Sequence, residues 1–304
     1  MTARAEAREG VRPLGLVKEA AGPRVRRLLR LARQRPLGAC ALLLVLGFIG
    51  MALTANLIAP YEPTQIFRRE VMVPPGPAHW LGTDNNGRDV LSRIIHGSRI
   101  SLAVGLASIA ISTVLGAALG IVSAHFEGTV DLVVQRFIDA KQAFPTIILA
   151  TAILAAFGPG ITNVIIAISF AGIAGATRVV RSAVLKEKQN VYVEAARAIG
   201  CGNGRVMWRH LLPNVTAPII IIGTVGLGQA IILEASLSFL GLAASEPTPS
   251  WGLMLSGATR RYILSAPWLA IFPGLAISLA VMGWNLLGDA LRDVWDPRLR
   301  GARG

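Results

Sequence analysis

The sequence predicts an all-α integral membrane protein with six transmembrane helices. The chain has 304 residues, of which 53% are hydrophobic and only 15% are charged. The apolar residues form runs of about 17–25, the length of helix that crosses the hydrocarbon core of a bilayer. Basic residues lie between these runs and almost none lie inside them. This segregation of charge is typical of multi-pass membrane proteins.

The net charge does not change this prediction. The chain carries 30 Lys and Arg against 17 Asp and Glu, a formal charge of +13, which alone would also suit a nucleic-acid-binding protein. Because the basic residues flank the apolar runs, we expect membrane lipids as their partners and no nucleic acid. Cys40 and Cys201 are too few for a disulfide framework, so we expect both to be free.

The six predicted spans follow one another with connections of unequal length. They are Leu37–Ala59, Ile100–Ala124, Phe137–Phe157, Ile161–Thr177, Val215–Leu240 and Pro267–Ala290. The third contains Pro145, which a membrane helix tolerates where neighbouring helices satisfy the freed backbone groups. Asp139 and Lys141 near its start are expected to form a local pair. About 35 mostly polar, Arg-rich residues precede the first span, which is too long for a cleavable signal peptide, so we expect that span to be retained.

The distribution of basic residues predicts that both chain ends face the cytoplasm. Ten precede the first span and seven follow the fourth, whereas Gly158–Gly160 carries none. Segment 60–99 is the exception, with five arginines diluted by four acidic residues. The chain is thereby divided into a cytoplasmic basic tail (1–36), a first transmembrane helix (37–59), an extracytoplasmic loop with an amphipathic helix (60–99), a five-helix core (100–290) with a cytoplasmic loop (179–214), and a cytoplasmic tail (291–304).

The cytoplasmic loop has the composition of a docking surface. Helix-forming residues run from Val191 to Ile199, and Gly200 then ends the helix. Glu194 lies near the helix start, where a carboxylate is favourable against the helix dipole. A second short helix follows and leads to Pro213. The small side chains that let another protein's backbone approach are Ala195, Ala196 and Ala198.

The order of these residues resembles the EAA loop of ABC-importer permease subunits. Glu194-Ala195-Ala196 is followed after three residues by Gly200 and later by Leu212-Pro213. His210 stands where many members carry Ile, but His-x-Leu-Pro-Asn is the pattern of the peptide-importer branch. Further segments that resemble the C-type permeases of dipeptide and oligopeptide importers are "HWLGTDNNGRDVLSRIIHGSRISL" (79–102), "EASLSFLGL" (234–242), "PSWGLML" (249–255) and "NLLGDALRDVWDPR" (285–298).

The resemblance covers residues from about 36 to 300 and implies a function. It implies a type I ABC-importer permease in a bacterial inner membrane, whose coupling helix docks on a cytoplasmic ATPase. The partners implied are a second similar permease, two ATPase subunits that bind ATP and Mg, and an extracytoplasmic substrate-binding protein. The substrates implied are dipeptides or oligopeptides, with nickel or glutathione as alternatives. The coupling residues implied are Glu194, Ala195, Ala196, Gly200, His210, Leu212 and Pro213.

The segment "GTDNNGRD" (82–89) is rich in oxygen ligands, yet its spacing does not fit a calcium loop. The expected ligand position after Asp84 and Asn86 is Arg88, and the expected glycine position holds Asp89. We therefore expect no metal site and interpret Asp84 or Asn86 as the cap of an amphipathic helix. That helix either packs against the bundle or meets a substrate-delivery protein. Its apolar stripe consists of Val90, Leu91, Ile94 and Ile95.

Polar residues in the fifth span raise the question of a translocation path, because burying them costs several kcal/mol unless they are paired. Glu234 lies in the outward half of this span, with Gln229, Ser236 and Ser238 nearby. Two interpretations stay open: a polar lining near the outer gate, or hydrogen bonds that fix helix packing.

The sequence also lacks the motifs of several alternatives. It contains no Gly-Lys-Ser or Gly-Lys-Thr, no Gly-x-Ser-x-Gly, no His-Glu-x-x-His and no Cys-x-x-Cys. We therefore predict no catalytic residues, no ATP site of its own and no cofactor on this chain. A self-sufficient secondary transporter would show inverted repeats, and none is evident. A membrane-embedded enzyme would need clustered catalytic groups.

Overall fold

The structure is a computed structural model that describes residues 36–243, 245–256 and 261–295. Most of the two predicted tails, 1–36 and 291–304, thus lies outside the described residues. The described residues from Leu37 onward form one compact unit of helices and loops. Two of its residues, Thr83 and Asp89, form an isolated bridge.

Among the described residues, five helices are long and apolar enough to cross a membrane: α2 (Pro36–Leu53), α4 (Val90–Phe126), α7 (Ile161–Glu187), α11 (Thr216–Phe239) and α14 (Trp268–Trp295). The predicted all-α membrane fold is therefore confirmed. The shorter helices are α3 (Ala55–Ile58), α5 (Gly128–Gln142), α6 (Thr146–Phe157), α8 (Val191–Ala198), α9 (Asn203–Arg205), the π-helix η1 (Val206–Leu211), α10 (Leu212–Asn214) and α12 (Trp251–Met254). Cys40 and Cys201 are free, as expected.

The third predicted span is not one helix. The prediction of a continuous helix over Phe137–Phe157 is wrong, because α5 ends at Gln142, α6 begins at Thr146, and the two are bent by 89°. Pro145 explains the break: it has no N–H to donate and disfavours helical backbone at the preceding residue. Counting this bent pair as one span brings the number to six.

The predicted amphipathic helix and the second span form one helix, α4, of 37 residues. At 1.5 Å per residue it is about 55 Å long, well beyond the ~30 Å of a hydrocarbon core. Neither Asp84 nor Asn86 caps it, contrary to the prediction: Asp89 does, accepting from the Ser92 N–H at 2.7 Å. Asp84 instead accepts from the N–H groups of Asn86 and Arg88 within the preceding turn. The stripe packs inside the bundle, since Val90, Ile94 and Ile95 are buried.

The expected pair of Asp139 and Lys141 does not form. Residues two apart on a helix point in different directions, and each side chain finds a partner on α7. Asp139 forms an ion pair with Arg178 at 2.6 Å. Lys141 donates to the carbonyl oxygen of Ala171 and lies over the ring of Phe170.

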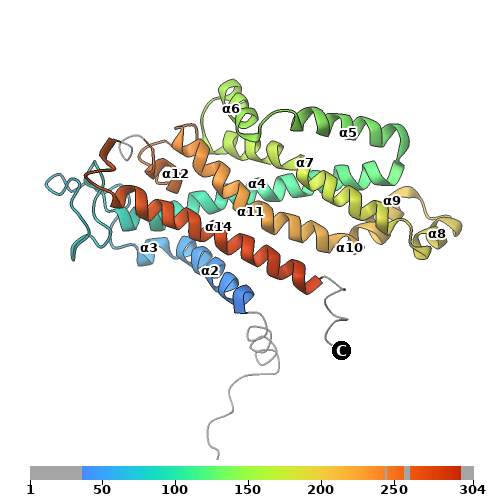
Figure 1. The fold of residues 1–304 in the computed structure, drawn as a ribbon, viewed down its shortest axis with the longest axis horizontal. Coiled ribbons are helices and arrows are strands. Elements are labelled where there is room, and N and C mark those ends of the chain that lie inside the picture. Colours follow the sequence, from blue (N-terminus) through green and yellow to red (C-terminus); the bar gives the residue numbers. More distant parts are fainter. Residues whose placement is uncertain (1–35, 244, 257–260, 296–304) are drawn as a thin grey trace, which may run out of the picture. The chain divides into compact units, whose positions relative to one another are not determined.

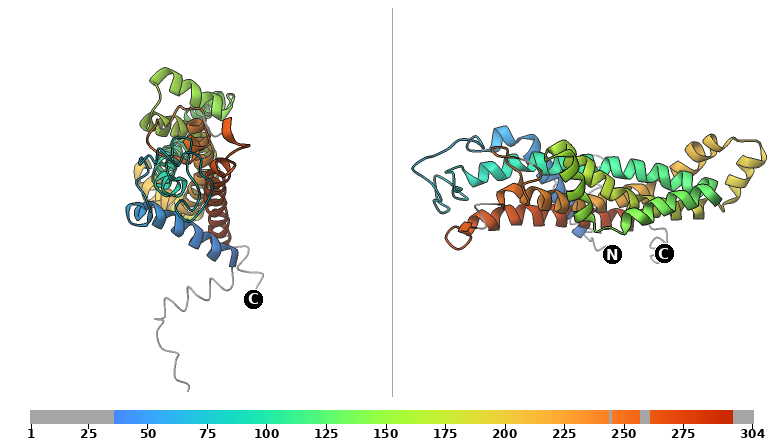
Figure 2. Two further views of the ribbon diagram at one scale, coloured as in Figure 1. Left: turned by 90° about the vertical axis from the view of Figure 1, so that its left-hand side faces the viewer. Right: turned by 90° about the horizontal axis from the view of Figure 1, so that it is seen from above.

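Long helices lying side by side form the bundle (Figures 1 and 2), and α4 and α7 approach most closely at glycines. A methyl group added at Gly116 would lie 2.5 Å from the Ala176 Cβ, and one at Gly120 would lie 2.7 Å from the Thr177 carbonyl oxygen. From α7, Gly172 faces Ser112 in the same way. Small residues thus let the two backbones touch.

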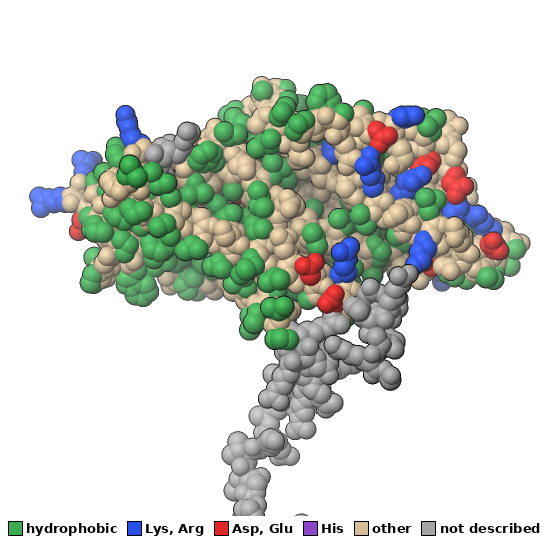
Figure 3. Space-filling model, in the orientation of Figure 1, with side chains coloured by type: hydrophobic (Ala, Val, Ile, Leu, Met, Phe, Trp, Pro, Cys, Tyr) green, Lys and Arg blue, Asp and Glu red, His purple; other side chains and the backbone are tan. Residues whose placement is uncertain are grey.

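Apolar side chains cover much of the surface over the middle of the bundle, while charged side chains gather toward the end that carries α8 and α9 (Figure 3). Leu43 on α2 and Val114 on α4 are 69% and 68% exposed. A soluble protein rarely exposes an apolar surface of this extent. It is the surface expected of helices that face lipid or partner helices.

The glycine contact predicts an unusual mutational result. Alanine normally stabilises a helix relative to glycine by ~1 kcal/mol, but Gly116→Ala should destabilise this protein by about 1–3 kcal/mol because the site is already full. Gly47→Ala in α2 is the control, since nothing lies within 4 Å of its added methyl group. Thermal unfolding in detergent measures both variants. Equal stability of the two variants would contradict the close contact.

Candidate functional site

The predicted docking segment forms a knob at one end of the long helices (Figures 1 and 2). We use "knob" for residues 191–214. Its first helix, α8, ends at Ala198, and Gly200 follows with φ +84°, a left-handed conformation that glycine adopts without strain. The predicted second helix is divided into α9, the π-helix η1 and α10. Pro213 lies in the short α10.

The knob has a buried side and an exposed side. Val193, Ala196, Val206 and Leu211 are buried and belong to one core cluster with residues from the ends of α4 and α7. Of the predicted coupling residues, Ala196 is therefore part of the support, Glu194, Ala195, Gly200 and Pro213 are exposed, and His210 and Leu212 are half-buried. The exposed side also carries three large apolar side chains, Val191, Ile199 and Trp208, each more than 70% exposed. Such a surface is typical of a protein-docking site.

Hydrogen bonds fix the knob on the end of α7. The Tyr192 hydroxyl donates to the Glu187 carboxylate at 2.6 Å, and the Asn190 side chain donates to the same oxygen at 2.9 Å. Burial and the hydrogen bond to Glu187 raise the pKa of Tyr192 to about 12. The phenol therefore stays protonated and remains a donor across the physiological pH range.

Three ion pairs join the knob-side half of α7 to the segment 127–139. Arg178 pairs with Asp139, Arg181 with Asp131 and Lys188 with Glu127. Lys188 also donates to the carbonyl oxygens of Ala124 and His125 at the end of α4. Each such pair near the surface is worth only ~0–1 kcal/mol, but together they determine how the end of α7 lies against α4 and α5.

A hollow of about 500 Å³ lies between α4, α6, α7 and α11. Its lining contains no charged residue among those described and includes the polar side chains of Ser112, Thr113, Thr146, Gln229 and Ser236. The last two belong to the predicted translocation path. The sequence did not predict the other three, Ser112, Thr113 and Thr146, because a single hydroxyl residue in an apolar run does not show which side of its helix faces a hollow.

The other two predicted path residues lie elsewhere. Glu234 is 1% exposed and accepts a hydrogen bond from the Ser238 hydroxyl at 2.7 Å. Ser238 lies 3.2 Å from the hydroxyl of Ser250, which precedes α12. Glu234 and Ser238 therefore join α11 to α12, and only Gln229 and Ser236 of the four line the hollow. Their part in translocation stays a prediction.

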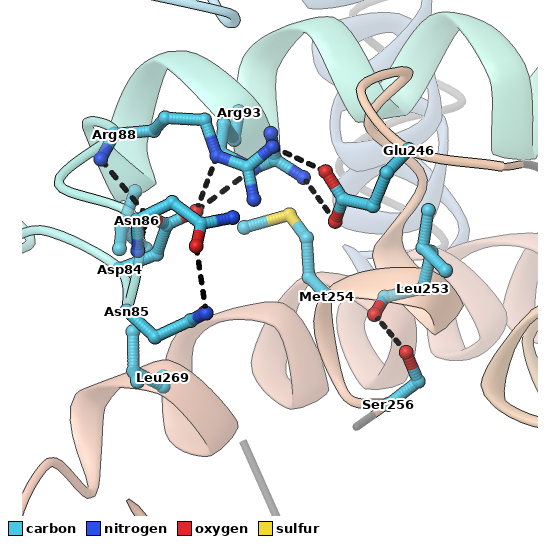
Figure 4. A pocket seen from close by; sticks show the side chains of 11 residues that line it. Asp84, Asn85, Asn86, Arg88, Arg93, Glu246, Leu253, Met254, Ser256 and Leu269 are labelled. Atoms are coloured by element: carbon cyan, nitrogen blue, oxygen red, sulfur yellow. Dashed lines mark hydrogen bonds and ion pairs between the residues drawn. The ribbon is translucent and has the colours of Figure 1, made fainter. Parts of the chain in front are cut away.

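The end of the bundle opposite the knob carries a four-residue charge cluster (Figure 4). Arg88 pairs with Asp84 and Glu246, and Arg93 pairs with the same two carboxylates. Segment 60–99 was the exception in the distribution of basic residues, and these ion pairs give two of its five arginines a structural role. Arg99, a third of these arginines, donates to the Ala52 carbonyl oxygen at 2.6 Å. Sequence reasoning missed this cluster because Glu246 is 158 residues from Arg88.

A buried histidine, His79, connects distant residues of the loop before α4 by hydrogen bonds. The two ring nitrogens of His79 lie 2.9 Å from an Asp89 oxygen and 2.8 Å from a Glu70 oxygen. Burial alone would lower the pKa of His79, but the two hydrogen bonds and the two negative charges outweigh it and raise the pKa above its usual 6.5. Within the described part of the chain, no group of three or more metal-ligating side chains occurs.

Fold and site together define a class: a helical membrane transport subunit with a polar hollow among its helices and an exposed knob at one end. The comparisons with known proteins agree. The chain belongs to the family of binding-protein-dependent transport system inner membrane components, whose model matches residues 116–301. It is thus a permease of the inner membrane.

Relatives match over most of both chains. The chain is 39% identical over 268 residues to a dipeptide transport system permease protein of Alkalihalophilus pseudofirmus, covering 88% of each. It is 43% identical over 267 residues to a di/tripeptide permease of Pseudomonas aeruginosa, covering 86% of this chain and 88% of the relative. It is 42% identical over 270 residues to a glutathione permease of Escherichia coli, covering 88% of this chain and 89% of the relative.

The fold is also that of a solved transporter. A chain of the MetNI methionine ABC transporter, in an inward facing conformation, superimposes with a TM-score of 0.56 at 19% identity. The match covers 67% of this chain and 97% of that chain. The expectation of an ABC-importer permease fold is therefore confirmed.

His79 predicts a pH dependence at this end of the protein. Its pKa is raised on folding, so the stabilisation is fully present below about pH 6.5, the unfolded value, and is lost as the pH rises through the folded value. Hydrogen exchange of residues 60–89 should therefore quicken from pH 6 to pH 8, after correction for intrinsic rates. His79→Gln should remove this dependence. If the corrected exchange rates depend on pH in the same way in wild type and His79→Gln, His79 is not the source of the pH dependence.

Proposed function

We propose that this chain is the permease subunit of an ATP-driven importer of short peptides and forms half of the translocation path. The observation that carries the proposal is the knob: an exposed Glu194 and exposed apolar side chains, supported on the buried ends of α4 and α7. A permease that moved its substrate without a separate motor would have no use for such a surface. The alternative of a self-sufficient secondary transporter is not favoured, because the family transports with a binding protein.

The partners follow from what the chain does not contain. The sequence has no phosphate-binding loop, so ATP and Mg bind to two separate ATPase subunits that dock on the knob in the cytoplasm. A second, similar permease completes the path, and an extracytoplasmic binding protein delivers the substrate. This chain is therefore a transport subunit and carries no cofactor or catalytic residue of its own.

The mechanism uses the close contact of α4 and α7. When the ATPases close on ATP they move the knob, and the knob moves the ends of both helices because its buried side packs on them. Both helices also line the hollow. Movement at the knob thereby changes the shape of the hollow. The break between α5 and α6 is the point at which α6, another wall of the hollow, changes its position.

The lining of the hollow supports a peptide substrate. Hydroxyl and amide side chains, including Gln229 and Ser236, can exchange hydrogen bonds with peptide groups as these pass. The absence of charge among the described lining residues suits substrates whose side chains vary. Relatives named for dipeptides, tripeptides and glutathione are 39–43% identical to this chain. Short peptides are therefore the class proposed, in preference to the alternatives of nickel or glutathione.

The coupling role predicts the effect of two substitutions. Glu194→Lys reverses the exposed charge at the docking surface, and Gly200→Val places a β-branched residue at φ +84°. Each should lower ATP-driven uptake about tenfold or more, since a loss of ~1.4 kcal/mol in docking has that effect. Membrane insertion should remain normal. Uptake and ATP hydrolysis are measured together in vesicles that contain the assembled transporter.

Gly202→Val is the matched control for the glycine substitution. Gly202 lies two residues further along the same turn, has φ −65°, and has open space around it. Valine adopts this backbone conformation without strain, so uptake should stay near the wild-type rate. Normal, ATP-coupled uptake by both Glu194→Lys and Gly200→Val would show that the knob does not couple the ATPases to transport.

A further inference from the structure

The charge cluster opposite the knob borders a cavity of about 260 Å³. The cavity lies between the turn before α4, the first turn of α4, the loop before α12 and the start of α14 (Figure 4). Arg88 and Arg93 form part of its wall, and the side chains of Asn85 and Asn86 contribute amide groups. The wall also contains the carboxylates of Asp84 and Glu246, so the cavity combines two buried cations and their partners with neutral hydrogen-bonding groups.

The two arginines are almost completely buried and need negative partners. Arg88 is 5% exposed and Arg93 is 2% exposed, and a buried cation is very costly unless it is paired. Asp84 supplies one negative charge. Its carboxylate lies 2.8 Å from the Arg88 Nε and 3.6 Å from the Arg93 Nε, and it also accepts from two backbone N–H groups. Asp84 is thus a fixed part of the site.

Glu246 supplies the second negative charge but is held differently. Its side chain is 52% exposed and reaches the arginines from the loop between α11 and α12. It pairs with Arg88 and lies 3.5 Å from the Arg93 Nη2. Another carboxylate can replace it without changing the charge balance of the site. Its departure without a replacement would leave the buried arginines with one unpaired positive charge.

We propose that Arg88 and Arg93 form a carboxylate-binding site in which Glu246 is a replaceable internal occupant. Guanidinium groups bind carboxylates through paired hydrogen bonds, and the neighbouring cavity gives an incoming group room to enter. The incoming carboxylate belongs either to the C-terminus of a delivered peptide or to an acidic side chain of the binding protein. The source of the incoming carboxylate rests on the proposed function, whereas the binding site itself rests on the positions of the two arginines and the cavity.

Release of Glu246 would act on the rest of the bundle through α12. The Trp251 ring on this short helix is buried and donates to the Ile94 carbonyl oxygen of α4 at 2.9 Å. Ser250 just before it is linked through Ser238 to Glu234 on α11. Since α11 also lines the hollow, an exchange of carboxylates at the outer end is connected to the path by direct contacts.

Glu246→Gln tests the proposal, because it keeps the size of the side chain and removes the competing charge. The assembled transporter is placed in nanodiscs with no ATP. Binding is measured first for the dipeptide Ala-Ala and its C-terminal amide, and then for the peptide-free binding protein.

The variant should bind one carboxylate source about tenfold more tightly than wild type, a change equivalent to ~1.4 kcal/mol. Tighter binding of Ala-Ala but not its amide assigns the peptide as the source, whereas tighter binding of the binding protein assigns that protein.

A second variant separates the site from a general effect of the substitution. Glu246→Gln combined with Arg88→Gln leaves Arg93 paired with Asp84 and keeps the buried charge balanced, so the gain in affinity should disappear. If Glu246→Gln folds normally and binds neither source more tightly than wild type, the carboxylate-binding site is wrong. ATP-driven uptake of Ala-Ala by the wild-type transporter is measured in parallel, so that failure of the proposed function would be recognised separately.

Discussion

The contact between α4 and α7 is the constraint on which the rest of the structure depends. At Gly116, Gly120 and Gly172 the two backbones approach so closely that a methyl group would collide. In a membrane, where apolar side chains gain little by leaving lipid, such close packing is a main source of helix association. Since α4 begins beside the charge cluster and α7 ends at the knob, the pair forms a support along the bundle.

Each functional region is attached to this pair. The knob packs its buried side on the ends of both helices, and Lys188 connects the end of α7 to the last carbonyl groups of α4. The hollow takes part of its wall from both helices. At the other end, Arg88 and Arg93 flank the start of α4 and hold the loop before α12 through Glu246. Helix α6 is bent by 89° from α5 and contributes Ala150 and Leu154 to an apolar cluster with Val164 and Ala167 of α7.

The sequence predicted the elements whose signal is local. Apolar runs located the spans, and the order of Glu194, Gly200 and Pro213 located the knob, because both patterns lie within about twenty consecutive residues. The start of α4 was missed because bilayer thickness suggested a span that begins at Ile100, whereas the helix already begins at Val90. The break at Pro145 was interpreted as a tolerated kink, because sequence does not show whether neighbouring helices support a proline.

Contacts between distant residues could not be predicted. Nothing in the local sequence pairs Arg88 with Glu246, or Asp139 with Arg178 in place of Lys141. Which polar residues of α11 face the hollow was equally hidden, since Gln229 and Glu234 look alike as polar groups in an apolar run. Helix rotation decides that Gln229 lines the hollow while Glu234 is buried toward α12.

The proposed coupling requires that α4 and α7 move as one body when the transporter works. Distances between spin labels test it in the assembled transporter, with Cys40 and Cys201 first replaced by serine. One pair of labels joins Val114 on α4 to Ser182 on α7, and the other joins Ile148 on α6 to Ser182; all three positions are exposed. Between the ATP-free and ATP-bound states, the α4–α7 distance should stay the same while the α6–α7 distance changes. An α4–α7 distance that shifts as much as the α6–α7 distance would show that the two helices do not move as one body.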